Sequence, residues 1–214
     1  MSAVSDRLNA VSRRLPEWGV WLLGLLPLAW LAFQVLSGGM LVDPVKAIEH
    51  DLGKTGLWLL FICLAIPPLR ALTGVNLIRH RRAAGLLAIL YIALHLLAWI
   101  WLDMGLLISQ ALSDLVKRPY LIMGVVAFLL LIPLAVTSNA ASIRRMGRSW
   151  RRLHLLIWPA TVLAVLHYLW QMKIIRPEGW IWAAILAGLL IWRLIQARIR
   201  ARREQIRTGF ADLR

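Results

Sequence analysis

Six long apolar segments follow one another along the chain, and short charged connections separate them. A helix that crosses the hydrocarbon core of a bilayer needs about 20 predominantly apolar residues, and segments of this length with few charges meet that condition. The pattern predicts an all-α, polytopic membrane protein with a bundle of six transmembrane helices. The predicted spans cover roughly residues 18–36, 56–72, 83–102, 119–136, 153–170 and 179–195.

Two of these segments are less regular than the others. The second contains Pro67, Pro68 and Arg70, and the sixth reaches Arg193 after only fourteen residues. Because arginine side chains can extend along apolar surface to the membrane interface, we keep both segments as spans. The stretch "DPVKAIEHDLGKTG", which precedes the second span, predicts a separate short amphipathic helix on the outer surface.

Composition supports the membrane class and adds little else. The 214 residues are 60% hydrophobic and 16% charged, whereas soluble domains have about 25% charged residues. No long polar segment is present, so we expect one transmembrane domain over residues 1–214. The first apolar run is long and lacks a small-residue cleavage site, which indicates an uncleaved span rather than a signal peptide. The single cysteine, Cys63, excludes an intrachain disulfide and a cysteine-ligated metal site.

Basic residues are concentrated on one side of the predicted spans. Of the 25 Lys and Arg residues, 19 lie in the two terminal regions and in the connections after the second and fourth spans. The positive-inside rule therefore places both termini in the cytoplasm. This topology accounts for the net charge of +15 without a nucleic-acid partner. It also leaves a surface that suits anionic lipid or an acidic protein.

Three of the five histidines lie in predicted spans, where an ionisable side chain is costly and marks a candidate functional site. His95 lies twelve residues after the start of its span and His167 fourteen, so we expect both at similar depth in the outer half. The spans offer no mid-depth carboxylate for a proton relay and no further ligands for zinc. Two imidazoles in apolar surroundings suit a bis-histidine haem, because the porphyrin supplies the other iron ligands. The alternative is a pair of histidines that form hydrogen bonds between helices.

The third intramembrane histidine, His154, starts the fifth span on the predicted cytoplasmic side. On an ideal helix, thirteen residues place it roughly 140° around the axis from His167, although Pro159 can kink the span and change this angle. His154 is therefore a candidate ligand of a second, inner haem, an interfacial polar residue or a flavin contact. His80 could be its partner, but the arginine-rich connection around His80 favours exposure to solvent.

Several ordered stretches carry a family resemblance. They are "GGMLVDPVKAIEH" after the first span, "GLWLLFICLAIPPLR" in the second, "RPYLIMG" at the start of the fourth, and "WRRLHLLIW" and "LHYLWQMK" at the two ends of the fifth. Together they resemble the MsrQ (YedZ) family, the haem-binding membrane subunits of protein-methionine-sulfoxide reductase systems. This family belongs to the ferric-reductase-like transmembrane superfamily, which includes the NADPH oxidases.

The resemblance implies cofactors and ligands. It implies one or two haems b bound through histidines of the third and fifth spans, which here are His95, His154 and His167. His95 and His167 are the expected ligands of the outer haem iron, and His154 is a candidate ligand of a second haem iron. Larger members of the superfamily have two histidines on each of these spans, whereas the third span here has one. FMN is a further expected cofactor.

The resemblance also implies a function in the bacterial inner (cytoplasmic) membrane. Electrons would pass from a cytoplasmic flavin reductase or quinone to a periplasmic molybdopterin methionine sulfoxide reductase of the MsrP type, which repairs oxidised periplasmic proteins. The residues agree with an electron-transfer subunit, because no G-x-G-x-x-G motif and no residue set for sulfoxide chemistry is present. The alternatives are a stand-alone ferric reductase-type cytochrome and a small non-haem transporter or assembly factor.

Overall fold

All regular structure in the described part of the chain is helical. The computed structural model describes residues 3–39, 42–172 and 174–211. It forms two compact units, Met1–Ile174 and Ile175–Arg214. Six helical segments in the described ranges are long and apolar enough to cross a membrane, which confirms the all-α class and the six spans. The prediction of one domain over the whole chain stays a prediction.

Each predicted span lies inside one of these six segments. The segments are Glu17–Leu36, Pro44–Thr73, Ile78–Asp103, Pro119–Val136, Arg148–Trp170 and Pro177–Ile206. The elements of the first unit are α1 (Ala3–Arg14), α2 (Glu17–Leu36), α3 (Pro44–Thr73), η1 (Ile78–His80), α4 (Arg81–Ala98), η2 (Trp99–Asp103), α5 (Ile108–Lys117), α6 (Pro119–Val136), α7 (Ala140–Met146), α8 (Arg148–Leu153), η3 (His154–Leu156) and α9 (Ile157–Trp170). The second unit contains α10 (Pro177–Ala211).

The second span begins earlier than the sequence pattern predicts. Helix α3 runs without interruption from Pro44 to Thr73, so the prediction of a separate short amphipathic helix before this span is wrong. Asp43 caps the helix by accepting a hydrogen bond from the Lys46 N–H at 3.2 Å, and Pro44 is compatible with the first helical turn. The Lys46 ammonium lies 2.8 Å from the Asp43 carboxylate and lowers the pKa of that carboxyl group. Gly74, at φ +77°, ends the helix in the left-handed conformation that glycine adopts readily.

Helix α1 packs with its polar face inward. Ser5, Asn9 and Ser12 are buried, whereas Val4 and Val11 are each 65% exposed. The inward face contacts the connection after α3. The Asn9 amide donates to the carbonyl of residue 74 at 3.1 Å and accepts from the N–H of residue 76 at 2.7 Å. Two hydrogen bonds from one side chain therefore fix α1 against this connection.

His80 also lies in this contact and is buried, so the expectation that it faces solvent is wrong. Its Nε2 lies 3.2 Å from the carbonyl oxygen of Ser12 and 3.2 Å from the Ser12 hydroxyl. A carbonyl oxygen can only accept, so Nε2 of His80 carries the proton. Packing of α1 against this connection removes His80 from water. The arginine residues next to His80 in the sequence gave no sign of this contact.

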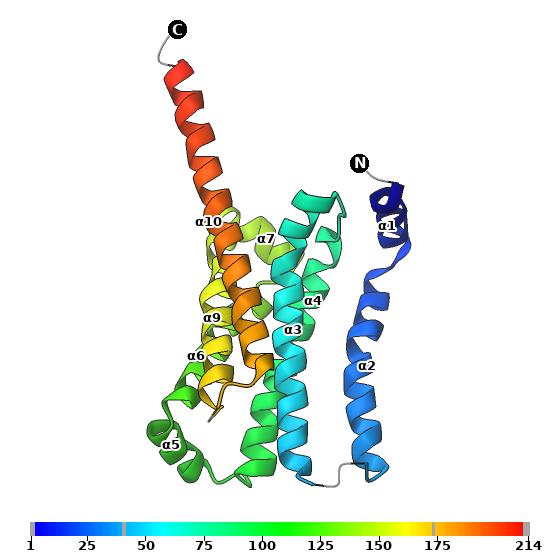
Figure 1. Ribbon diagram of the computed structural model, residues 1–214, viewed down its shortest axis with the longest axis vertical. Helices are drawn as coiled ribbons and strands as arrows, with labels where there is room; N and C mark the ends of the chain where they lie inside the picture. Colours follow the sequence, from blue (N-terminus) through cyan, green and yellow to red (C-terminus); the bar gives the residue numbers. More distant parts are fainter. Residues whose placement is uncertain (1–2, 40–41, 173, 212–214) are drawn as a thin grey trace. The chain divides into compact units, whose positions relative to one another are not determined.

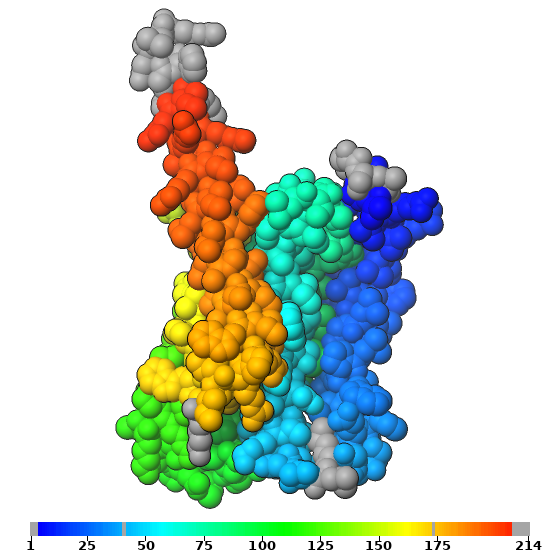
Figure 2. Space-filling model, in the orientation of Figure 1, coloured from blue at the N-terminus to red at the C-terminus, as the bar shows by residue number. Residues whose placement is uncertain are grey.

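Two pairs of packed helices form the centre of the first unit (Figure 1). Helix α3 packs against α4, and α6 packs against α9, while α4 touches α6 and α3 touches α9. Helix α2 lies along the α3–α4 pair, and Figure 2 shows α2 (blue) and α3 (cyan) meeting along the visible face. Large apolar side chains of α2, such as Trp30 at 61% and Phe33 at 59%, remain exposed, as expected for a helix that faces lipid.

The first unit has two distinct ends (Figure 1). We call the end with α1, the connection 74–77 and α7 the arginine-rich end. The opposite end carries the end of α2, the start of α3 and helix α5. The sequence prediction that the arginine-rich end faces the cytoplasm stays a prediction.

Candidate functional site

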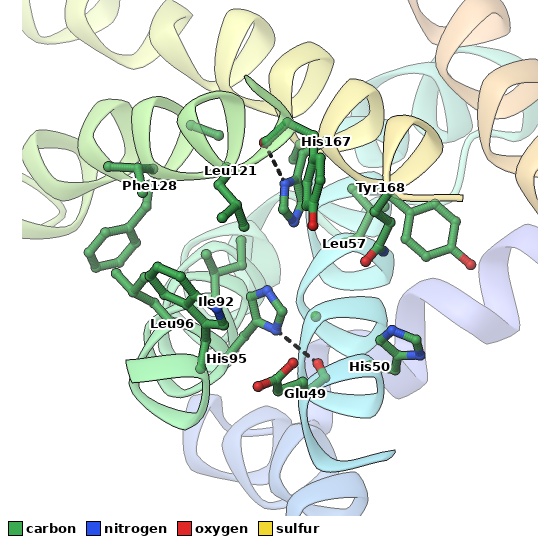
Figure 3. Close-up of a pocket in the computed structure, with 18 of the residues that line it drawn as sticks. Glu49, His50, Leu57, Ile92, His95, Leu96, Leu121, Phe128, His167 and Tyr168 are labelled. Carbon is green, nitrogen blue, oxygen red and sulfur yellow. Dashed lines mark hydrogen bonds between the residues drawn. The ribbon is translucent and has the colours of Figure 1, made fainter. Parts of the chain in front are cut away.

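A cavity of about 240 Å³ lies between α3, α4, α6 and α9, toward the opposite end of the first unit. Its wall is mainly apolar and aromatic, as is usual for sites that hold a small molecule or cofactor. Figure 3 shows side chains from these helices converging on it. The apolar lining includes Leu57, Ile92, Leu96, Leu121 and Phe128.

Two histidines from different helices point into this cavity. His95 of α4 donates from Nδ1 to the carbonyl oxygen of Glu49 on α3, at 2.8 Å. His167 of α9 donates from Nδ1 to the carbonyl oxygen of Tyr120 on α6, at 2.7 Å. Because a carbonyl oxygen only accepts, both rings carry a proton on Nδ1, and in the neutral imidazole Nε2 then keeps a bare lone pair. This tautomer is the one that can bind a metal through Nε2.

The two rings face each other. Their centroids are 6.2 Å apart and their planes are inclined at 70°, and in Figure 3 the second nitrogen of each ring is turned toward the other ring. Two in-line bonds of about 2 Å to one metal ion, plus about 1 Å from each nitrogen to its ring centre, give a centroid distance of about 6 Å. The spacing of His95 and His167 therefore fits one iron atom held from two sides.

The mouth of the cavity is polar and charged. Lys46, Lys54 and Arg118 line it together with Glu49 and Asp103. The Glu49 Oε1 atom is buried and has no hydrogen-bond partner among the described residues. Cationic side chains at the mouth of an apolar cavity match a ligand with a flat apolar body and acidic groups at one edge, because each part then meets its complement.

His154 does not join this pair. It is in η3, near the arginine-rich end, and it does not line the cavity. The Thr137 hydroxyl donates to the Pro133 carbonyl at 2.6 Å and lies 3.1 Å from Nε2 of His154. Since the single hydroxyl proton is used, His154 is the donor in the second contact. Its ring also packs against Trp150, with centroids 3.9 Å apart and planes inclined at 30°.

Side chains alone do not form a metal site here. Within the described ranges no group of three or more His, Cys, Asp and Glu residues is placed to hold a metal ion. His95 and His167 could therefore complete the coordination of an iron whose other ligands come from a cofactor. The donor set, the centroid spacing and the apolar walls fit a haem better than a bare metal ion.

Known proteins are similar in sequence to this chain along nearly its whole length. The family model "Ferric reductase like transmembrane component" matches residues 52–165. Proteins named "Protein-methionine-sulfoxide reductase heme-binding subunit MsrQ" from Brucella ovis, Brucella canis and Brucella suis are each 40% identical over 210 residues, which is 97% of this chain and 96% of each relative. The chain belongs to the MsrQ family. No solved structure matches it.

In this member of the MsrQ family, the two histidines predicted as ligands lie together at the cavity, and their assignment as ligands stays a prediction. The groups that hold the two rings were not predicted. The acceptors are the backbone carbonyls of Glu49 and Tyr120, a group that every residue type has, so the residue types at these positions do not indicate the contact. In the folded chain the two contacts have nearly the same sequence separation: His95 follows Glu49 by 46 residues, and His167 follows Tyr120 by 47. Each interval corresponds to one packed helix pair, so the same arrangement occurs twice around the cavity.

Proposed function

We propose that this chain is a haem b membrane subunit that carries electrons from cytoplasmic flavin or quinone donors to a periplasmic methionine sulfoxide reductase. The observation that carries the proposal is the His95–His167 pair, with bare Nε2 atoms facing each other across an apolar cavity. The name of the Brucella relatives, heme-binding subunit of a protein-methionine-sulfoxide reductase, agrees with it. The chemistry on the sulfoxide is then expected on a separate periplasmic subunit.

In this proposal His95 and His167 hold the haem iron, and the haem supplies one-electron chemistry. The chain contributes position and environment. The carbonyls of Glu49 and Tyr120 fix the tautomer and orientation of the two imidazoles, as hydrogen-bond acceptors behind ligating histidines do in metal sites. The apolar lining excludes water, and Lys54 and Arg118 at the mouth suit the propionate groups of the haem.

The direction of transfer in the proposal follows from charge and depth. The arginine-rich end faces the cytoplasm by the positive-inside rule, in a bacterial inner membrane. The histidine pair lies toward the opposite end, so it is the exit site for electrons. Flavin reductase, quinone and FMN are the proposed donors and cofactor on the cytoplasmic side, where basic residues attract anionic groups.

We also propose, as an alternative, that His154 is a ligand of a second haem. It would need a new ligand geometry, because Nε2 of His154 donates to Thr137. In the neutral ring the remaining lone pair of His154 is on Nδ1, and the ring packs against Trp150. A single haem, with a flavin or quinone reduced near the arginine-rich end, leaves these contacts intact.

Transfer across a vesicle membrane of known orientation tests this function. Reduced flavin or quinol is supplied on the arginine-rich side, and a purified periplasmic-type methionine sulfoxide reductase with its substrate on the other. We expect sulfoxide reduction with this arrangement, none with the sides exchanged, and none with His167→Ala. Equal reduction in both orientations would overturn the direction. Oxidation of the haem by iron chelates but not by the reductase would assign the chain to ferric reduction instead.

A further inference from the structure

The two histidines of the cavity are held by the same local device. His95 donates to the carbonyl of residue 49, and residue 53, one helical turn later, is glycine. His167 donates to the carbonyl of residue 120, and residue 124, again one turn later, is glycine. On both α3 and α6, the residue whose carbonyl accepts the hydrogen bond is therefore followed four residues later by a glycine, which has no side chain.

Helix geometry explains why these two features belong together. In an α-helix the carbonyl of residue i points toward the N–H of residue i+4, and its second lone pair can accept another hydrogen bond. A donor from a neighbouring helix that uses this lone pair must approach the surface of the helix beside residue i+4. A Cβ atom at i+4 stands next to this approach, and glycine removes it.

The distances agree with this reasoning. A Cβ atom built on Gly124 would lie 2.9 Å from Nδ1 of His167 and 3.1 Å from its Cε1. A Cβ atom built on Gly53 would lie 3.2 Å from Nδ1 of His95 and 3.3 Å from its Cε1. A side chain at Gly124 would force the His167 ring or its helix to shift, and one at Gly53 would require the His95 ring to move by a few tenths of an ångström. The contact at Gly124 is the tighter of the two.

We infer that Glu49–Gly53 and Tyr120–Gly124 set the position and plane of the two imidazoles. We call each of these pairs, an acceptor carbonyl and the glycine four residues after it, a notch. This inference rests on the proposed function, since it concerns the ligands of the proposed haem. Gly53 and Gly124 are positioning residues that touch the ligands and act through them. The carbonyl draws each ring against its helix, and the glycine allows the ring to come close enough for a short hydrogen bond.

The notches also fix the angle between the rings. Each ring is held at Nδ1 by one carbonyl and on its side by one glycine, which leaves little rotation about the axis toward the cavity. The observed inclination of 70° is far from parallel. The low-spin EPR signal of an oxidised bis-imidazole haem depends on this angle, so the signal reports the notch directly.

Alanine substitutions at the glycines test the inference. Gly124→Ala and Gly53→Ala are compared with two control variants that leave the histidines untouched. A Cβ atom at Gly85, on the same helix as His95, would meet only Cys63 Sγ at 3.7 Å. A Cβ atom at Gly24 would lie 2.3 Å from a side-chain methyl group of Leu87, which makes it a control for crowding away from the site.

The measurements are haem retained per chain, the EPR signal of the oxidised protein, its midpoint potential and its thermal stability. We expect Gly124→Ala to weaken haem retention roughly 10-fold and to shift the EPR signal and potential, with smaller shifts in Gly53→Ala. Gly85→Ala should match the wild type, and Gly24→Ala should lose only thermal stability. The milder crowding at Gly53 gives a second reading if Gly124→Ala fails to accumulate.

The outcomes separate this inference from the proposed function. A wild-type protein with bis-histidine haem whose spectrum and potential are unchanged in both Gly53→Ala and Gly124→Ala would overturn the notches and keep the function. A wild-type protein that binds no haem would overturn the proposed function and, with it, the role of the notches. Equal EPR shifts in Gly24→Ala and Gly124→Ala would mean that general crowding, not the notch, moves the rings.

Discussion

The imidazole rings of His95 and His167 lie with centroids 6.2 Å apart, although 72 residues separate them in the chain. Each ring is held by a backbone carbonyl of the helix paired with its own, through hydrogen bonds of 2.8 Å and 2.7 Å. Neither histidine uses the other as a hydrogen-bond partner. Two interhelical hydrogen bonds therefore orient both rings and leave both Nε2 atoms directed into the same cavity.

His154 should contribute to stability through Thr137 and not to the spectrum of the outer site. Because its Nε2 donates to the Thr137 hydroxyl at 3.1 Å, His154→Ala and Thr137→Val should each lower the free energy of unfolding by about 1 kcal/mol. The double variant should lose less than the sum, since both remove one shared contact. Thermal unfolding in detergent measures the three losses, and absorbance is recorded on the same samples. Lower haem content in His154→Ala would instead assign this residue to a second haem.

Tyr91 should stabilise the contact between α2 and α4. Its hydroxyl donates to the Gly24 carbonyl at 2.7 Å and accepts from the Leu28 N–H at 3.0 Å, two groups that pair directly in an uninterrupted helix. Tyr91→Phe removes both bonds, and we expect the free energy of unfolding to fall by about 1–3 kcal/mol. A smaller loss is expected from Thr161→Val, because the Thr161 hydroxyl donates to the Ile157 carbonyl of its own helix, at 2.7 Å. Equal losses in the two variants would contradict a bridging role for Tyr91.

Asn9 should hold helix α1 in place. The side chain makes hydrogen bonds to Gly74 and Asn76, so Asn9→Ala leaves two backbone groups without these partners, at a cost of about 1–3 kcal/mol. We expect α1 to detach more often and trypsin to cut faster after Arg13 and Arg14, which is visible on a gel. Val11→Ala, on the exposed side of the same helix, serves as the control. Unchanged cleavage of the Asn9 variant would show that other contacts hold α1.

The sequence was sufficient to predict the spans and the depth of the histidine pair. Long apolar runs have one stable solution in a bilayer, because every backbone polar group must be satisfied within the segment. The constant rise of a helix then converts residue counts into depth. These two facts placed His95 and His167 at similar depth before any contact was known.

Other features depend on packing and were not predictable in this way. The polar residues Asn9 and Ser12 turn inward because they bond to backbone groups of the connection after α3. These partners lie more than 60 residues away in the chain, so the local sequence pattern gives no sign of the contact. The same contact buries His80, which its arginine neighbours had placed in solvent. The notch carbonyls of Glu49 and Tyr120 are backbone atoms, identical in every residue type, and only the helix pairing selects them.

The central claim is that His95 and His167 hold one haem between them, and haem stoichiometry tests it most directly. Haem per chain is measured in the wild type, in His95→Ala, in His167→Ala and in the double variant, with His80→Ala, a histidine outside the cavity, as the control. If both histidines bind one iron, each single variant should lose the same haem, and the double variant should lose no more than either. The control should keep the wild-type ratio and spectrum. Losses that add in the double variant, or full haem retained in both single variants, would contradict a shared site.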